Sequence, residues 1–430
     1  MAFSTGLVAV ALTDVGMRRT TNQDSHALSI ADTLDTYLSR GHLLIVADGM
    51  GAHAAGELAS KLAAEGIAHL YHHHRDISAP EALLRAIRET NTEIHRRGTA
   101  NPDFHNMGTT LSALALLPQG AIAAHVGDSR IYRLRGSTLH QLTFDHSLQW
   151  ELQRSGQLPP GTDIGAMVPK NVITRSLGPN QSVEIDLEGP HPIAIGDVFL
   201  LCSDGLTGKV DDAELGAILA AVPPPEAARA LVDLANLRGG PDNITVLIAK
   251  VAGTEAATGG IQAPTLRVGS SQAKRPVHPM VWVAAAACVL AAGLMALMKL
   301  WIVAGVALVG GIVAVIVGLA QRYQGYKAGT ELGGGRMLGK GPHITVECPP
   351  SHALAQKLAG TLEELREAAQ GGAWQINWGP LDDACKAAGA ADAASQFAEA
   401  IRHYCRGISY MMNELRRQNV KKAGDSVLPN

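Results

Sequence analysis

Short apolar runs alternate with longer amphipathic stretches from residue 6 to residue 253. The runs have the length of β-strands, and the longer stretches repeat apolar positions with the helical period. We predict strands at Leu7–Thr13, His42–Ala47, Thr110–Leu117, Ala121–Val126, Val198–Cys202 and Ile244–Val251. We predict helices at Ala54–His73, Pro80–Arg97, Asp145–Ser155 and Ala227–Leu237. Short turns between several runs favour antiparallel hairpins, so residues 1–253 are predicted to form one mixed α/β (α+β) domain.

The composition changes after this domain. Residues 254–276 are rich in Gly, Ala, Ser, Thr and Gln and have no apolar period, so we predict a flexible linker. Met280–Met298 and Leu300–Ala320 follow without an acidic residue, and about 20 apolar residues cross the roughly 30 Å hydrocarbon core of a bilayer. We therefore predict two transmembrane helices forming a hairpin over 277–321, with a turn at Met298–Trp301. A buried pair of soluble helices is the alternative.

Charge and cysteine content indicate where such a chain resides. Lys299 is the one basic residue in the predicted turn, whereas several flank the hairpin: Arg267, Lys274, Arg275, Arg322, Lys327, Arg336 and Lys340. Because basic loops stay in the cytoplasm, we expect a multi-pass protein of the cell (inner) membrane with both ends cytoplasmic. No secretory signal begins the chain, and the five cysteines form no C-x-x-C pair, as in a reducing compartment. The formal net charge of -3 gives no reason to expect nucleic acid as a partner.

Residues 322–430 are predicted to form a separate cytoplasmic region that is mainly helical. We expect one helix from Ser351 to Gln370 and another from Ala391 to about Gln418. The second carries an apolar seam with the heptad spacing: Phe397, Ile401, Tyr404, Ile408, Met411 and Leu415. The seam fits either packing inside a small helical domain or a homodimeric coiled coil, so it leaves the oligomeric state open.

Acidic residues recur where the predicted strands end. Asp48-Gly49, Asp204-Gly205 and Asp242-Asn243 each adjoin an apolar strand, and Asp24 and Asp128 occupy comparable turns. A single Asp in such a place is usually only a turn residue. Several carboxylates at strand ends can instead converge on Mg²⁺ or Mn²⁺, which prefer oxygen ligands. The glycine after Asp48 also lets a backbone carbonyl approach a cation closely, so we predict a metal-dependent hydrolytic centre.

Two further side chains extend this hypothesis. Arg19 lies in the turn after the first strand, and its planar guanidinium can bind two phosphate oxygens. His53 follows Asp48 by five residues and can reach the same site.

The order of these motifs resembles the PPM (type 2C) family of metal-dependent protein serine/threonine phosphatases. The resemblance covers residues 6–253 and rests on Thr-Asp-x-Gly…Arg-x-x-Asn-Gln-Asp, Asp-Gly-Met-Gly-x-His, Met107-Gly-Thr-Thr110, Gly-Asp-Ser-Arg, Cys-Ser-Asp-Gly-Leu and Gly-Gly-Pro-Asp-Asn. It implies a four-layer α-β-β-α sandwich of antiparallel sheets. It also implies that phosphorylated proteins are the substrates and that a cognate Ser/Thr kinase system supplies them.

The resemblance also implies roles for single residues. Asp48, Asp204, Asp242 and the carbonyl of Gly49 would bind two Mn²⁺ or Mg²⁺ ions. Asp24, Gln23 and Asn243 would support this shell, the first two through metal-bound waters. Arg19 would bind the phosphate, and His53 would protonate the leaving Ser or Thr oxygen, while a hydroxide bridging the two metals attacks phosphorus.

Other implied features are less direct. Asp128 resembles a ligand of a third, weaker metal, but it also fits a turn residue bonded to Arg130. The segment Asp145–Thr174 is predicted to be the flap beside the site. Gln23 replaces a glutamate and Ala52 replaces a glycine of the family pattern; the first substitution is expected to lower metal affinity, because an amide brings no charge.

The sequence thus predicts a membrane-anchored protein phosphatase. Two alternatives stay open: a catalytically silent phosphoprotein-binding sensor or scaffold, and a partner-switch phosphatase with one dedicated regulatory substrate. Loss of a metal-binding aspartate would favour the scaffold, and none is lost. The glycine-rich run Gly334–Lys340 has P-loop spacing, but Gly341 follows where a hydroxyl would be needed for Mg²⁺. We therefore read that run as a juxtamembrane segment.

Overall fold

The computed structural model describes residues 5–51, 54–155, 172–268, 279–324, 330–332, 338–372 and 375–425. The chain divides into two compact units. The first comprises Met1–Arg75, Ala82–Pro264 and Gly335–Asn430, and the second comprises Asp76–Glu81 and Thr265–Gly334. The first unit holds all the candidate site residues.

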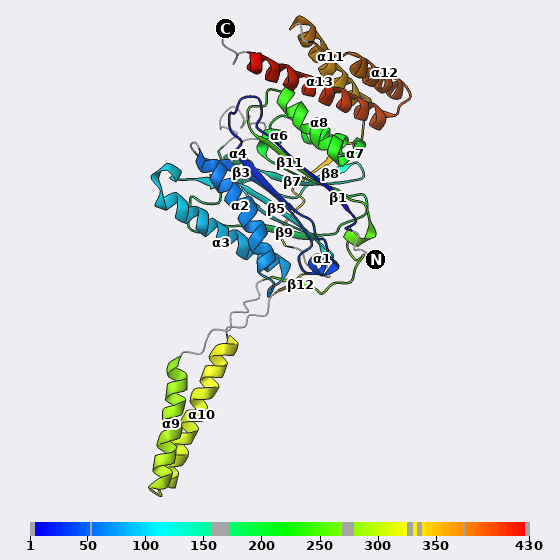
Figure 1. Ribbon diagram of the computed structural model, residues 1–430. Coiled ribbons are helices and arrows are strands. Elements are labelled where there is room, and N and C mark those ends of the chain that lie inside the picture. Colours follow the sequence, from blue (N-terminus) through cyan, green and yellow to red (C-terminus); the bar gives the residue numbers. More distant parts are fainter. Residues whose placement is uncertain are drawn as a thin grey trace. The chain divides into compact units, whose positions relative to one another are not determined.

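Two antiparallel sheets form the centre of the first unit (Figure 1). One has the order β1 (Leu7–Asp14), β11 (Ile244–Val251), β10 (Val198–Cys202), β7 (Arg130–Arg135), β8 (Thr138–Gln141) and β14 (Ile344–Glu347). The other has the order β2 (Asp24–Ser29), β3 (His42–Met50), β5 (Leu111–Leu117), β6 (Gly120–Val126) and β9 (Asp186–His191), with β4 (Gly108–Thr109) beside β3.

Apolar side chains from both sheets meet in a shared core. Leu44 and Val46 of β3 pack with Phe199 and Leu201 of β10 in one cluster of fully buried residues. Alternate residues of a strand point to the same face, so these pairs identify the faces that the two sheets turn toward each other. This packing confirms the predicted sandwich of antiparallel sheets.

Helices cover the outer faces of both sheets (Figure 1). α2 (Ala54–His73) packs on β2 and β3, and α3 (Ala79–Ala100) lies beside α2. α7 (Asp212–Ala221) and α8 (Pro224–Leu237) pack on the other sheet. Where the structure describes the unit's first 264 residues, the remaining helical segments are short: α1 (Leu34–Arg40), η1 (Pro102–Phe104), α4 (Leu148–Ser155), α6 (Asp204–Thr207) and η2 (Thr254–Ala256).

The C-terminal region differs from the prediction of a separate piece. It joins the first unit: β14 pairs with β8, and α13 (Phe397–Asp425) packs on α7 and α8. α11 (His352–Gly371) and α12 (Gly379–Ala393) complete this helical layer. The seam residues Ile401, Tyr404, Ile408 and Met411 belong to the same buried cluster as α7 and α8. The seam therefore packs within the chain.

Gly216 of α7 and Cys348 show how closely the C-terminal region packs on α7. A Cβ on Gly216 of α7 would lie 2.1 Å from Cys348 Sγ, just after β14. α7 is buried on nearly every side, because the sheet covers one face and the C-terminal layer covers another. Two buried faces leave no polar stripe, which explains why this helix was not predicted.

The predicted linker is partly ordered in the first unit. Thr258 N donates to Ile193 O at 3.0 Å, and Gln119 Nε2 donates to Pro264 O at 2.6 Å. The first half of the segment 254–276 is therefore held against the sandwich by hydrogen bonds. Residues 269–276 lie outside the described residues.

The second unit contains a helical hairpin and a short β-ladder. α9 (Pro279–Leu297) packs on α10 (Trp301–Gln324), and β12 (Leu266–Val268) pairs with β13 (Thr330–Leu332). The hairpin turns between Leu297 and Trp301, as predicted. Within the described residues, no helix combines the length and the apolar character required to cross a bilayer. The structure therefore does not support the two predicted membrane spans.

Candidate metal centre

The sandwich gathers the candidate acidic residues from both sheets. Asp24 begins β2 and lies opposite Asp48 of β3 in the strand register. Asp204 begins α6 directly after β10, and Asp242 lies two residues before β11. Asp128 occupies the turn between β6 and β7. Since β3 contacts both β10 and β11 across the core, one end of the sandwich carries all five carboxyl groups.

The other four carboxyl groups lie close enough to Asp48 to change its pKa. Burial raises the pKa of the Asp48 carboxyl well above its usual range, and negative neighbours raise it further. These neighbours are Asp24, Asp204, Asp128 and Asp242. Buried carboxylates that repel one another are stabilised when a cation binds between them.

Two neighbours are perturbed in the same direction. Burial raises the pKa of Asp24 to about 7, although hydrogen bonds from Ser203 and Thr245 lower it. Ser203 Oγ donates to Asp24 Oδ2 at 2.7 Å. Burial also raises the pKa of Asp128 to about 7, and the charge of Asp204 adds to the shift. The positive charge of Arg130 lowers the pKa of Asp128 only in part.

Several carboxylate oxygens of this group have no hydrogen-bond partner among the described residues. Asp24 Oδ1, Asp128 Oδ1 and Asp204 Oδ1 are buried and accept no hydrogen bond from that part of the chain. Unpaired buried acceptors are costly, and these are the hard oxygen donors that Mg²⁺ and Mn²⁺ prefer. Where the structure describes the chain, however, no three His, Cys, Asp or Glu side chains are already arranged to hold a metal ion. The donor chemistry fits divalent cations, and ligation would require side-chain adjustment.

Backbone and hydroxyl groups fix the position of Asp48. Thr110 Oγ1 accepts from Asp48 N at 2.9 Å, and Thr109 Oγ1 donates to Asp48 O at 2.9 Å. Thr109 and Thr110 of the Met107–Thr110 motif therefore hold the backbone of Asp48 in place. A Cβ on Gly49 would lie 2.1 Å from Gly56 O, so this position accepts glycine alone. The hydroxyls of the motif were part of the predicted pattern, but their bonds to Asp48 were not foreseen.

Asn243 ties together the loop that precedes β2. Its Nδ2 donates to Val15 O at 2.9 Å and Thr21 O at 3.0 Å, and its Oδ1 accepts from Gln23 N at 2.8 Å. The side chain therefore supports the loop that carries Arg19 and Gln23. The prediction placed Asn243 around the metal shell; the structure gives it this backbone-bracing role.

Arg19 lies beside one of the predicted metal ligands. Its Nη2 donates to Asp242 Oδ2 at 2.9 Å, and about half of the Arg19 side chain is exposed. The loop reaches this point because Met17 N and Arg18 N both donate to Gly240 O. Exposure leaves guanidinium donors available to an anion.

Two predicted features involve residues near Gly51. Gln23 Nε2 donates to Gly51 O at 3.4 Å, so this amide faces the backbone of the Asp-Gly-Met-Gly turn. His53 and Ala52 lie outside the described residues. The general-acid role of His53 therefore stays a prediction.

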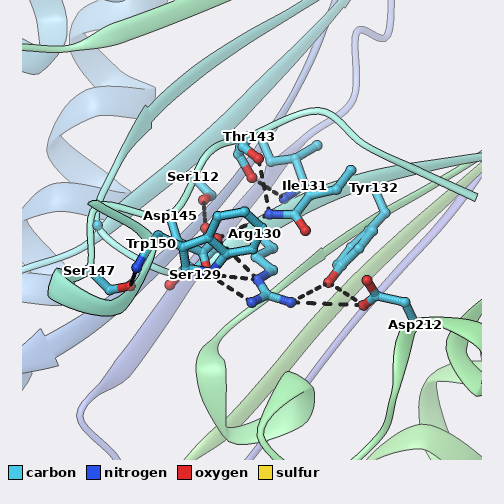
Figure 2. A network of polar contacts seen from close by, with 12 residues as sticks. Ser112, Ser129, Arg130, Ile131, Tyr132, Thr143, Asp145, Ser147, Trp150 and Asp212 are labelled. Atoms are coloured by element: carbon cyan, nitrogen blue, oxygen red, sulfur yellow. Dashed lines mark hydrogen bonds and ion pairs between the residues drawn. The ribbon is translucent and has the colours of Figure 1, made fainter. Parts of the chain in front are cut away.

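Arg130 and Asp145 form the strongest polar network near the centre (Figure 2). Arg130 Nε and Nη2 donate to Asp145 at 2.7–3.0 Å, and Arg130 Nη1 donates to Tyr132 Oη at 3.0 Å. Tyr132 Oη donates in turn to Asp212 Oδ1 at 2.8 Å. The guanidinium is thus engaged by Asp145. Among the described residues, no hydrogen bond or ion pair joins Asp128 to Arg130, and the metal role of Asp128 stays a prediction.

A cavity of about 470 Å³ opens beside the acidic residues. Arg19, Asp128, Asp204 and Asp242 all line it. The predicted flap contributes Asp145, Ser147, Gln149 and Trp150 to the lining, which also includes Thr207 and Lys209. Residues 156–171 of the flap lie outside the described residues. The lining combines carboxyl groups with the cationic side chains of Arg19 and Lys209, a combination suited to a cation-bound phosphate ester.

Known proteins share this domain. A family model described as protein phosphatase 2C matches residues 17–224. Protein phosphatase PhpP of Streptococcus pneumoniae is 39% identical over 243 residues, which are 55% of this chain and 94% of the relative. The chain belongs to the protein phosphatase 2C family. It is therefore a metal-dependent protein phosphatase acting on phosphorylated Ser and Thr.

Other protein phosphatase 2C relatives also align with about half of this chain and with most of their own length. The serine/threonine phosphatase Stp of Listeria innocua is 39% identical over 211 residues, covering 48% of this chain and 83% of the relative. A solved serine/threonine phosphatase of S. agalactiae has 36% identity and a TM-score of 0.50, covering 57% of this chain and 99% of its own. This protein phosphatase 2C chain thus extends well past the aligned domain.

Proposed function

We propose that this chain hydrolyses phosphoserine and phosphothreonine on proteins with two divalent cations held by Asp48, Asp204, Asp242 and the Gly49 carbonyl. The observation that carries the proposal is one cavity lined by Asp128, Asp204, Asp242 and Arg19. The buried oxygens without partners supply ligand positions. When bound, the cations supply an acidified water and neutralise phosphoryl charge.

The side chains of the protein divide the remaining work. Arg19 lines the cavity and binds the phosphate through its guanidinium donors, which bond to Asp242 in the metal-free protein. Asp24 and Gln23 orient the water shell of the cations, while His53 delivers the proton to the leaving oxygen. Asp128 holds a third, weaker cation. Mn²⁺ and Mg²⁺ both suit such carboxylate ligands.

Asp204→Asn in the full-length chain tests this proposal. We expect the wild type to hydrolyse a phosphothreonine peptide with Mn²⁺ and the variant to lose at least about a hundredfold in kcat. Circular dichroism should show an unchanged fold. Asp103→Asn, at an exposed position of η1, is the matched control and should keep full activity. An active Asp204→Asn variant would refute the metal assignment.

The same assay separates the alternative functions. A silent sensor would bind the phosphopeptide without turnover in the wild type. A partner-switch phosphatase would ignore a panel of unrelated phosphopeptides and act on one protein. Capture of substrates by full-length Asp204→Asn protein, followed by identification of the kinase that phosphorylates them, addresses the predicted cognate kinase system.

We also propose that the α9–α10 hairpin attaches the protein to the cell (inner) membrane, with both ends of the chain in the cytoplasm. Large apolar side chains face outward from the hairpin, and Leu290, Leu297 and Ile302 are 75%, 82% and 85% exposed. Exposed apolar surface of this kind marks contact with lipid or with another protein. Recovery of the full-length chain in carbonate-washed membranes would support the proposal. Recovery in the soluble fraction would refute it.

A further inference from the structure

We infer that Arg416 of α13 is a positioning residue for the loop that carries Arg19, so that the C-terminal helical layer sets the affinity of the site for phosphate. The inference rests on the proposed role of Arg19. It assigns a function to a part of the chain that lies outside the family match.

Arg416 is anchored on the helix beneath α13. Its Nη2 lies 2.9 Å from Asp233 Oδ1 of α8, and Asp233 is fully buried. A buried carboxylate without a cation nearby is strongly destabilising. Asp233 therefore holds the guanidinium of Arg416 in a defined place at the interface of α8 and α13.

The same guanidinium reaches the end of β1. Arg416 Nη2 lies 3.3 Å from Asp14 Oδ2. The other oxygen, Asp14 Oδ1, accepts from Gly16 N at 2.9 Å and from Asn236 Nδ2 at 3.1 Å. Asp14 thus connects α13 and α8 to Gly16, at the start of the loop that carries Arg19.

The loop then leads to the cavity with little freedom. Gly16 has a φ of +82°, and a Cβ there would lie 2.1 Å from Asp242 O. Met17 N donates to Gly240 O at 2.8 Å, and Arg19 ends against Asp242. The far end of the loop is held by Asn243. Arg416 therefore supports the end of the loop at which Asp14 and Asn236 lie.

Removing Arg416 would leave Asp14 and Asp233 without their shared cation. Their repulsion would move Asp14 away from the α8–α13 interface and loosen its bond to Gly16. Small displacements of a substrate-binding group weaken its interactions with the substrate. The expected result is weaker phosphate binding by Arg19, with the acidic residues left in place.

The experiment compares full-length Arg416→Ala, Arg416→Lys, Asp233→Asn and the double variant Arg416→Ala/Asp233→Asn. The double variant removes the buried carboxylate together with its partner, so that stability is recovered while the contact with Asp14 stays absent. We expect KM for a phosphothreonine peptide, and the inhibition constant of inorganic phosphate, to rise about tenfold in both Ala variants, with kcat and Mn²⁺ affinity within about twofold of wild type. Arg416→Lys should recover part of the phosphate affinity.

Controls separate the outcomes. Arg417→Ala changes the next residue, which is 72% exposed, and should leave all four constants unchanged. If the double variant has the same KM and inhibition constant as Asp233→Asn alone, Arg416 has only a structural role and the inference is wrong. If the wild type lacks activity, or Arg19→Ala keeps its phosphate affinity, the proposed function fails instead.

Discussion

Arg19 Nη2 and Asp242 Oδ2 are 2.9 Å apart, so the proposed phosphate-binding side chain is ion-paired with a proposed metal ligand. Both side chains are partly exposed, and exposed pairs are worth about 1 kcal/mol or less. A divalent cation at Asp242 would therefore outcompete the guanidinium and release it toward the phosphate. We therefore expect metal binding and phosphate binding to be coupled through this pair.

Arg19→Ala tests that coupling. We expect KM for a phosphothreonine peptide to rise about tenfold or more, because a bidentate donor to phosphate is lost. Mn²⁺ affinity should be unchanged or higher, since Asp242 loses its competing partner. Isothermal titration with Mn²⁺ and steady-state kinetics measure the two effects. Weaker Mn²⁺ binding in the variant would contradict the competition.

Asp48→Asn is expected to make the metal-free protein more stable. The substitution removes a buried carboxyl group that four acidic neighbours repel, and relief of that repulsion should raise the free energy of unfolding by about 1–2 kcal/mol. Saturating Mn²⁺ should raise the melting temperature of the wild type but have little effect on the variant, because a ligand stabilises only the state that binds it. Differential scanning calorimetry with and without EDTA measures both shifts. A variant that is less stable without metal would show that Asp48 is held by favourable contacts.

Gly216→Ala should loosen the C-terminal layer. The added methyl group would overlap Cys348 Sγ at 2.1 Å, and overpacking of this kind costs about 1–3 kcal/mol. We expect a lower melting temperature and faster proteolysis after β14. Gly389→Ala in α12 is the control, because nothing lies within 4 Å of its Cβ position; it should be neutral or slightly stabilising. Equal stability of Gly216→Ala and wild type would mean that β14 and α7 do not pack closely.

Glu214 of α7 forms ion pairs that join the sandwich to the C-terminal helical layer. Burial acts to raise the pKa of its carboxyl, but hydrogen bonds from Arg238 and Lys357 lower that pKa to about 2. Arg238 Nη1 and Lys357 Nζ lie 2.7 Å and 2.9 Å from the carboxylate. Since Lys357 belongs to α11, this ion cluster joins the C-terminal layer to α7 and α8.

The pH dependence follows from the direction of that shift. A carboxyl group with a lowered pKa in the folded state stabilises the protein above its usual pKa of about 4.5, and the effect disappears as the pH falls toward about 2. Glu214→Gln should lower the free energy of unfolding by about 2–3 kcal/mol at pH 7, and the difference should shrink below about pH 4.5. Urea unfolding at several pH values measures it. Glu65→Gln, at an exposed position of α2, should show no such trend; a Glu214→Gln difference independent of pH would refute the ionic origin.

Local pattern was sufficient for the strands and helices with one clear environment. α2 has the predicted bounds, Ala54–His73, and β11 has the predicted bounds, Ile244–Val251. α2 rests one face on a sheet, and β11 is buried almost throughout, so their apolar patterns are regular. β2 and β14 were not predicted, because neither has a continuous apolar run. β2 pairs with β3, the next strand of the chain, and β14 pairs with β8, about 200 residues earlier. Both strands therefore depend on partners that their own local pattern does not specify.

The sequence by itself determined the order of the acidic motifs, the donor chemistry of Asp48, Asp204 and Asp242, and the family to which the domain belongs. These properties depend only on residue type and spacing, which can be read directly from the sequence. Only the tertiary structure decided that β14 and α11–α13 join the catalytic unit and that Arg416 lies beside Asp14. Such contacts form between segments about 200 to 400 residues apart, and they depend on burial of a shared apolar surface, which no local pattern records.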